Sequence, residues 1–134
     1  MRVLLAVSLL AALTWSQAAV AQERSVPASG TIPMPGWTAT YVTEGTGLPC
    51  IVLSLRNFHP RSFSARFKGL LRCTFLDVRF SAPEAVADPK NPYTVDAAVE
   101  DLEAARKALG ISRFVLVGHS IQGSIALRSA TRST

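Results

Sequence analysis

Histidine and cysteine are scarce in this sequence. Only two residues of each type occur among 134, too few for a four-cysteine zinc site or for a scaffold held together by many disulfides. Long runs of like charge are absent as well, and 49% of the residues are apolar against 17% charged. This balance excludes an intrinsically disordered chain, and the length fits one globular domain. We expect neither a metal centre nor a cofactor.

The positive charges do not form a pattern typical of nucleic-acid binding. The formal net charge is +5, which by itself suits an anionic partner. The basic residues are scattered, however, and the densest group, between residues 56 and 72, lacks aromatic side chains arranged as a stacking platform. We interpret this group as the solvated face of a helix and expect no nucleic-acid partner.

The first 21 residues have the pattern of a secretory signal peptide. Arg2 precedes a largely apolar run over residues 3–13, and the segment ends with Ala19-Val20-Ala21, a small-residue cleavage pattern. The run is shorter than the roughly 20 apolar residues that a membrane-spanning helix needs. We therefore expect cleavage after Ala21 and an exported protein, periplasmic or secreted, with no membrane partner after cleavage. An uncleaved anchor is the alternative.

Short apolar runs predict a sheet that is buried on both faces. Residues 50–55 form a continuous apolar run typical of such a strand, residues 73–78 are interpreted as another short apolar strand, and residues 113–117 as a third buried strand. Residues 37–43 alternate β-branched or aromatic side chains with others and indicate one more strand.

Helices are predicted between and after these strands, over residues 60–71, 94–109 and 121–130. The alternation predicts an α/β fold, a mostly parallel sheet flanked by helices, with its chemistry at the carboxyl ends of the strands. Residues 22–36 contain three prolines and are interpreted as a flexible N-terminal segment, with an edge hairpin as the alternative. Residues 80–93 are predicted to be a loop.

The two cysteines occupy equivalent places in the predicted strands. Cys50 begins one apolar run and Cys73 begins the next, so both are expected at the same end of neighbouring parallel strands. An oxidising compartment would permit a disulfide between them. Two buried free thiols are the alternative, and the sequence leaves both open.

The strand at 113–117 leads into the one motif found at a strand end. Gly118-His119-Ser120-Ile121-Gln122-Gly123 follows it and precedes the last helix. This context is that of a nucleophile elbow, in which a strained backbone lifts a serine hydroxyl clear of the sheet. Ser120 is the candidate nucleophile, and the backbone N–H of Ile121 is the candidate donor to an oxyanion. A phosphate-binding loop has the same glycine spacing, but it would continue with lysine and not with Ser124.

At these residues the chain resembles the α/β-hydrolase superfamily, especially its proline-iminopeptidase-like and esterase-like serine hydrolases. Gly118-His119-Ser120 matches the Gly-His-Ser-x-Gly-Gly elbow of that family. Residues 93–102 resemble the helix before the elbow, Asp77-Val78-Arg79 resembles the Asp-x-Arg-Gly after the fourth strand, and Gly45-Thr46-Gly47 resembles an early turn. The resemblance covers residues 37 to 130.

The resemblance implies hydrolysis of a small-molecule ester or a peptide through an acyl-enzyme on Ser120. It also implies a second oxyanion donor after the third strand, for which the backbone N–H of Leu55 or Arg56 is the nearest candidate. The sequence departs from the family pattern at three places. Gln122 replaces a small residue of the elbow, and Ser54-Leu55 replaces a His-Gly pair. Phe80 replaces a glycine.

The acid and the histidine of a triad follow the serine in this superfamily, and residues 121–134 contain no Asp, Glu or His. The ring of His119 is expected to pack beside the elbow and away from the hydroxyl, and His59 is interpreted as a loop histidine. We therefore interpret residues 37–134 as a partial α/β-hydrolase domain that ends just after the elbow. On this interpretation the product is truncated or frame-shifted, and the chain alone is inactive.

A non-catalytic role is the alternative. The strand before the elbow is expected to leave one edge of the sheet unpaired, and such an edge promotes association. The chain would then be a truncated remnant, or an interaction module that self-associates or binds another chain through this edge.

Overall fold

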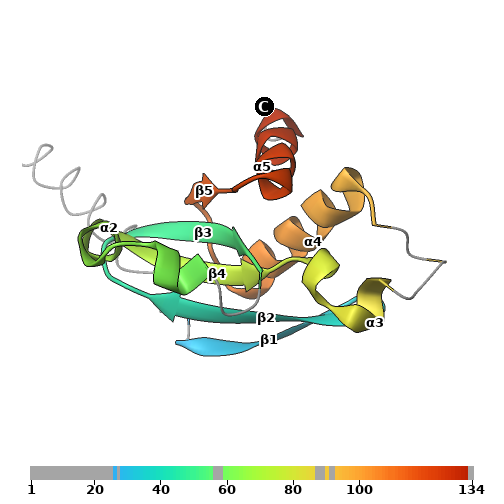
Figure 1. Ribbon diagram of the computed structural model, residues 1–134, viewed down its shortest axis with the longest axis horizontal. Helices are drawn as coiled ribbons and strands as arrows, with labels where there is room; N and C mark the ends of the chain where they lie inside the picture. Colours follow the sequence, from blue (N-terminus) through green and yellow to red (C-terminus); the bar gives the residue numbers. More distant parts are fainter. Residues whose placement is uncertain (1–25, 27, 56–58, 87–89, 91–92, 133–134) are drawn as a thin grey trace, which may run out of the picture.

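The computed structural model describes residues 26, 28–55, 59–86, 90 and 93–132. The predicted signal peptide, residues 1–21, lies outside these ranges. Within them, none of the helices combines the length and the apolar character that crossing a membrane requires. The described residues form one sheet with helices around it, and Figure 1 shows the sheet with the chain's C-terminal helix beyond one edge.

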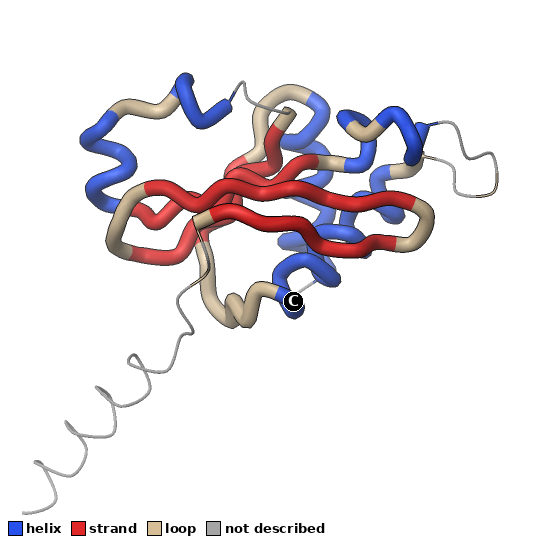
Figure 2. Tube along the Cα trace, turned by 90° about the horizontal axis from the view of Figure 1, so that it is seen from below, coloured by secondary structure: helices blue, strands red, loops and turns tan. Residues whose placement is uncertain are grey.

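The sheet has five strands in the order β1-β2-β4-β3-β5. Their bounds are β1 (Ser29–Met34), β2 (Trp37–Glu44), β3 (Leu48–Ser54), β4 (Leu71–Asp77) and β5 (Val115–Val117). β4, β3 and β5 are parallel, whereas β1 and β2 are antiparallel to their neighbours. The prediction of an α/β fold with parallel central strands is confirmed. Figure 2 shows the strands, in red, side by side as one layer.

An edge hairpin occupies part of the segment at 22–36. β1 and β2 pair from Ser29 opposite Val42 to Met34 opposite Trp37. Gly36 lies in the turn between them with a φ of 79°, a conformation that glycine adopts without steric cost. The prediction of a flexible segment is therefore wrong for residues 29–36, and the alternative of an edge hairpin is confirmed there.

The predicted helix over 60–71 is divided and shorter. A 3-10 turn, η1 (His59–Ser62), precedes α2 (Ala65–Leu70), and Phe63 and Ser64 separate the two. The Ser64 hydroxyl accepts a hydrogen bond from the backbone N–H of Phe67 at 3.2 Å, which caps α2 at its start. A capping serine stops the helix from extending back to Pro60, although the apolar spacing suggested one continuous helix.

Residues 80–93 contain short helical pieces where a loop was predicted. η2 (Arg79–Ser81) and α3 (Pro83–Val86) follow β4 directly. Proline is well tolerated in the first turn of a helix, so Pro83 begins α3. Residues 87–89 and 91–92 lie outside the described ranges.

α4 (Val95–Ala108) confirms the clearest helix prediction. Thr94 caps it by accepting from the N–H of Ala97 at 3.0 Å. Arg106 and Lys107 lie in its last turn, where cations suit the helix dipole, and Gly110 follows with a φ of 68°.

Two apolar clusters lie against the sheet. The larger joins side chains of β1–β4 with α4 residues such as Val99 and Leu102 and with Ile125 of the last helix, α5 (Ile121–Arg132). The smaller consists of Cys50, Val52, Cys73 and Phe75, with Phe63, Phe67, Leu71 and Val117 packed against it. α4 and α5 therefore share one cluster, while Phe67 of α2 and Phe63, just before it, pack against the other.

Cys50 and Cys73 are register partners on β3 and β4, as expected for the same end of neighbouring strands. Both are buried and free. The structure thus supports the alternative of two buried free thiols, and no disulfide joins these two residues.

Candidate active site

Ser120 lies at a sharp turn between β5 and α5. Its φ is +59°, and it is the one residue other than glycine with a positive φ in the described part of the chain. Its side chain is exposed to solvent. A non-glycine residue in this region costs energy and persists only where its surroundings impose it. The backbone strain predicted for the elbow is present.

Gly118 makes this turn sterically feasible. A Cβ at Gly118 would overlap the carbonyl oxygen of Gln122, whereas a Cβ at Gly123 would lie 3.6 Å from the carbonyl oxygen of Gly118, an ordinary contact. The strand before the elbow and the helix after it therefore approach most closely at Gly118. Of the two glycines in the motif, only Gly118 is required for the turn.

The backbone donors at the start of α5 are arranged around the apex. The N–H of Gln122 donates to the His119 carbonyl at 3.2 Å, and the N–H of Gly123 donates to the Ser120 carbonyl at 2.9 Å. Among the described residues the N–H of Ile121 has no hydrogen-bond partner. A free N–H at a helix start, next to the serine, suits the oxyanion donor predicted for Ile121.

Gln122 fills the position where the family has a small residue. Its side chain is 1% exposed, and its Nε2 has no partner among the described residues. The turn absorbs this side chain by burying it, with Ile125 of the next helical turn also buried. The sequence predicted that a side chain had to be accommodated here, and the structure places it inside the molecule.

His119 differs from the expectation. Its side chain was expected to pack beside the elbow, but the residue is exposed to solvent. His59, the other histidine, is the first residue of η1. The Ser120 hydroxyl forms no hydrogen bond with any described residue, so no base lies in position in this part of the chain.

The carboxyl ends of the three parallel strands lie at the end of the sheet that carries the elbow. Val52 pairs with Val117, and Ser54 pairs with Asp77 two residues further on. Leu55 follows Ser54 directly and packs half-buried against the larger cluster. Leu55 therefore lies at the same end of the strands as Ser120. Its role as an oxyanion donor stays a prediction. Arg56, the other candidate, lies outside the described residues.

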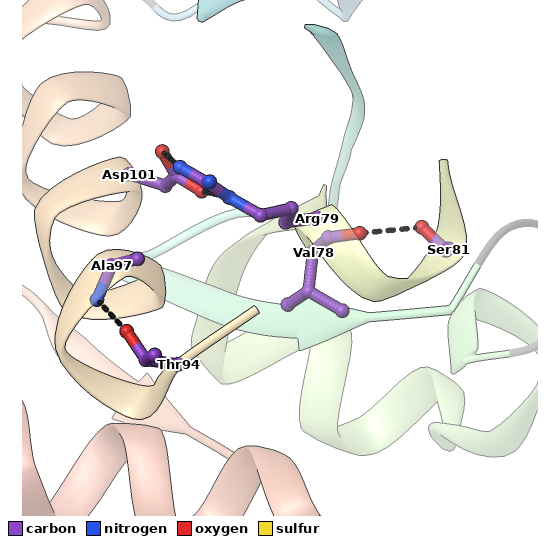
Figure 3. A network of polar contacts seen from close by, with 6 residues as sticks. All are labelled: Val78, Arg79, Ser81, Thr94, Ala97 and Asp101. Atoms are coloured by element: carbon purple, nitrogen blue, oxygen red, sulfur yellow. Dashed lines mark hydrogen bonds and ion pairs between the residues drawn. The ribbon is translucent and has the colours of Figure 1, made fainter. Parts of the chain in front are cut away.

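A buried ion pair behind this edge was missed by the sequence interpretation. Arg79 donates from Nε and Nη2 to the two carboxylate oxygens of Asp101, at 2.8 and 2.9 Å (Figure 3). Asp101 was predicted only as part of the helix over residues 94–109, but it is buried and paired. Its place beside Leu102 on the apolar side of α4 was the available signal.

A second carboxylate, Asp77, anchors the end of β4. The Thr40 hydroxyl donates to its Oδ2 at 2.5 Å, and the residue is buried. The backbone N–H of Val78 donates to the Ser54 carbonyl at 3.2 Å. These bonds fix the strand ends beside the elbow.

An ion pair links the two helices that flank the elbow. Arg128 of α5 donates to Asp96 of α4 at 3.0 Å, and Arg132 lies 3.5 Å from the same carboxylate. The hydrogen bond from Arg128 lowers the pKa of Asp96 below its usual value. The pair lies at the surface, with both side chains about half exposed, and it joins α4 to α5.

Comparisons with known proteins agree with this geometry. The chain is 30% identical over 96 residues to the AB hydrolase superfamily protein YclE of Bacillus subtilis strain 168, covering 71% of this chain and 34% of that protein. A proline iminopeptidase-related protein from Thermus thermophilus has a TM-score of 0.66 and 28% identity, covering 78% of this chain and 40% of that one. No protein-family model matches.

An α/β fold family hydrolase from Bacillus anthracis strain Sterne is similar to the same extent, with a TM-score of 0.64 and 27% identity over 78% of this chain and 39% of the other. This chain thus spans between a third and two fifths of the length of these relatives.

The fold and the elbow define a class, the α/β-hydrolases. The described residues have the fold of the N-terminal part of these proteins, and the predicted resemblance to the superfamily is confirmed over that part.

Proposed function

We propose that this protein is an exported serine hydrolase that cleaves ester or amide bonds through an acyl-enzyme on Ser120. The observation that carries the proposal is the positive φ of Ser120 at the junction of a strand and a helix. That conformation holds an exposed hydroxyl at the strand ends, where substrates bind in open α/β sheets. The similarity to a proline iminopeptidase-related protein supports an amide or peptide substrate.

In the proposed reaction, the Ser120 oxygen attacks the carbonyl carbon and its proton passes to a base. The negative charge that develops on the carbonyl oxygen is stabilised by the N–H of Ile121 and by a second donor, for which we propose Leu55. The leaving group departs with that proton, and water then hydrolyses the acyl-enzyme. The serine hydroxyl is a weak nucleophile without a base, so the proposed reaction needs a histidine and an acid beside Ser120.

Serine at the apex favours ester or amide hydrolysis over the chemistry of branches that use aspartate there. Several structurally similar proteins are epoxide hydrolases, but an aspartate would be the expected nucleophile in that branch. The export of the protein is proposed from residues 1–21 alone, whose pattern is that of a cleaved signal.

A fluorophosphonate probe tests the proposal on the intact protein. We expect the probe to label Ser120, as located by peptide mass spectrometry, and p-nitrophenyl esters to be hydrolysed. Ser120→Ala should abolish both signals, whereas Ser124→Ala, an exposed serine one helical turn further on, should preserve them. Labelling that is absent, or that survives in Ser120→Ala, would refute the serine mechanism.

The second candidate is a non-catalytic module that associates through the edge of the sheet. β5 is the terminal strand of the described sheet, and Val115 on it is 41% exposed. An exposed apolar edge strand is a template for pairing with another chain. Light scattering on a concentration series tests this role. Association that disappears in Val115→Lys would support it, and a monomer at all concentrations would exclude it.

A further inference from the structure

A pair of nucleophilic side chains that the proposed reaction does not use lies inside the sheet. Cys50 of β3 and Cys73 of β4 are register partners in a parallel pair. Register partners in a sheet project to the same face, and neighbouring strands lie about 4.7–4.9 Å apart. Both cysteines accordingly belong to the same small apolar cluster.

The cluster keeps both thiols protonated and shielded. Each cysteine is 0% exposed, and Val52 and Phe75 lie in the same cluster. The Cys73 thiol donates to the carbonyl oxygen of Leu71 at 3.6 Å. Burial, together with the neighbouring Cys73 thiol, raises the pKa of Cys50 to about 12, and burial raises the pKa of Cys73 as well. Reagents that attack one thiolate at a time will therefore react slowly here.

The placement of the two thiols suits a bridging atom. Because register partners on neighbouring strands project to the same face, one atom can bond both sulfurs. No disulfide joins the two residues, which are free thiols. No group of three or more His, Cys, Asp or Glu side chains able to hold a metal occurs in the described ranges. Soft thiolate ligands select soft centres.

We propose that Cys50 and Cys73 form a dithiol site for trivalent organoarsenic compounds. With phenylarsine oxide, two S–H bonds break and two S–As bonds form. Both protons leave with the oxygen of the arsenic oxide as one molecule of water, and no atom changes its oxidation state. Because the product needs both sulfurs, the site discriminates against compounds that bind only one thiol.

The ligand reaches the thiols by displacement of α2. This helix has six residues and none of them is buried, although Phe67 packs against the cluster and Lys68 lies over the Phe75 ring. An ion pair between Lys68 of α2 and Glu44 of β2, 2.5 Å long, is one of the ties that hold the cover in place. Short elements with few buried contacts open locally at a lower free energy than global unfolding. Lys68→Ala should therefore speed the reaction without changing its stoichiometry.

Intact-mass spectrometry with phenylarsine oxide, in the presence of excess glutathione, tests the site on the folded chain. We expect one phenylarsine adduct per chain, removed by a dithiol such as dimercaptopropanol. Cys50→Ser and Cys73→Ser should each lose the adduct, because a single As–S bond exchanges with glutathione. Circular dichroism establishes that each variant is folded. No adduct on the folded chain, or an adduct that persists in either variant, would overturn the proposal.

Thermal unfolding gives a second readout. A ligand that binds the native state raises the melting temperature by mass action, whereas one that binds only unfolded chains lowers it. Phenylarsine oxide should raise the melting temperature of the wild-type chain and leave that of Cys50→Ser unchanged. A lowered melting temperature would show that the thiols react only after unfolding, and the native site would be rejected.

Discussion

The guanidinium of Arg79 and the carboxylate of Asp101 form a two-pronged ion pair in the interior, with hydrogen bonds of 2.8 and 2.9 Å. Arg79 follows β4 and Asp101 lies in the middle of α4, so the pair joins the strand ends to the helix that precedes the elbow strand. Both side chains are nearly inaccessible to solvent, at 4% and 11%. Their charges are therefore compensated by each other and not by water.

Breaking this pair on one side should destabilise the fold strongly. Arg79→Met leaves the Asp101 carboxylate buried without its partner, which costs about 3–5 kcal/mol. The double variant Arg79→Met/Asp101→Leu removes both charges and should recover most of that loss. Urea denaturation measures the unfolding free energy of each variant relative to wild type, and an unchanged m value shows that the difference is one of stability.

Lys107→Met is the matched control for that experiment. Lys107 pairs with Glu103 at 3.5 Å on the surface of α4, with both side chains largely exposed. Such a pair contributes at most about 1 kcal/mol. If the double variant at Arg79 and Asp101 were as unstable as Arg79→Met alone, the penalty would not come from an uncompensated charge.

The elements with strong local signals were predicted well. α4 is determined by its N-terminal cap, Thr94, and by the helical spacing of apolar residues such as Val99 and Leu102. The cap and the spacing are both visible in the sequence. The same holds for β3, whose continuous apolar run from Cys50 reflects burial on both faces. These features depend on neighbours within a few positions, so no knowledge of the fold is needed.

Features that depend on distant partners were predicted less well. The partner of Asp101 is Arg79, 22 positions earlier, so no local pattern around Asp101 indicates the ion pair. The ring of His119 was expected to pack beside the elbow, but the residue, next to the turn at Ser120, is exposed to solvent. The elbow itself was found because Gly118 and Ser120 combine a local motif with a strand before it and a helix after it.

Alanine at the two glycines of the elbow should have opposite effects on stability. In Gly118→Ala the new Cβ overlaps the carbonyl oxygen of Gln122, and the backbone must shift at a cost of about 1–3 kcal/mol. In Gly123→Ala the new Cβ meets only an ordinary contact inside α5, so the helix should gain about 0.5–1 kcal/mol. Urea denaturation measures both. Equal destabilisation would contradict the close approach at Gly118.

A cysteine at the apex should be more acidic than one further along the helix. In Ser120→Cys the thiolate would lie beside the N–H of Ile121 at the start of α5, where the helix dipole favours negative charge. Its pKa should fall about one unit below the ordinary value near 8.5. The rate of iodoacetamide alkylation against pH measures it.

Ser124→Cys supplies the comparison, since Ser124 is also exposed but lies within the helix. Both thiols are introduced into a chain carrying Cys50→Ala and Cys73→Ala, so that only one thiol reacts. Equal pKa values at the two positions would mean that the apex offers no anion stabilisation, and Ile121 would lose its role as an oxyanion donor.

Stability should fall in acid partly through Glu103. Hydrogen bonds from Arg106 hold the pKa of Glu103 at about 2, below its usual 4.5. A carboxyl whose pKa is lowered by folding stabilises the native state above 4.5, and this contribution is lost as the pH falls from 4.5 towards 2. The side chain is 47% exposed, so solvent screening limits the effect to less than about 1 kcal/mol.

The variant Glu103→Gln isolates this contribution. Its difference from wild type in unfolding free energy should be constant above the usual pKa and should shrink towards zero in acid. A difference for Glu103→Gln that did not change with pH would show that the Arg106 contact does not stabilise the ionised form.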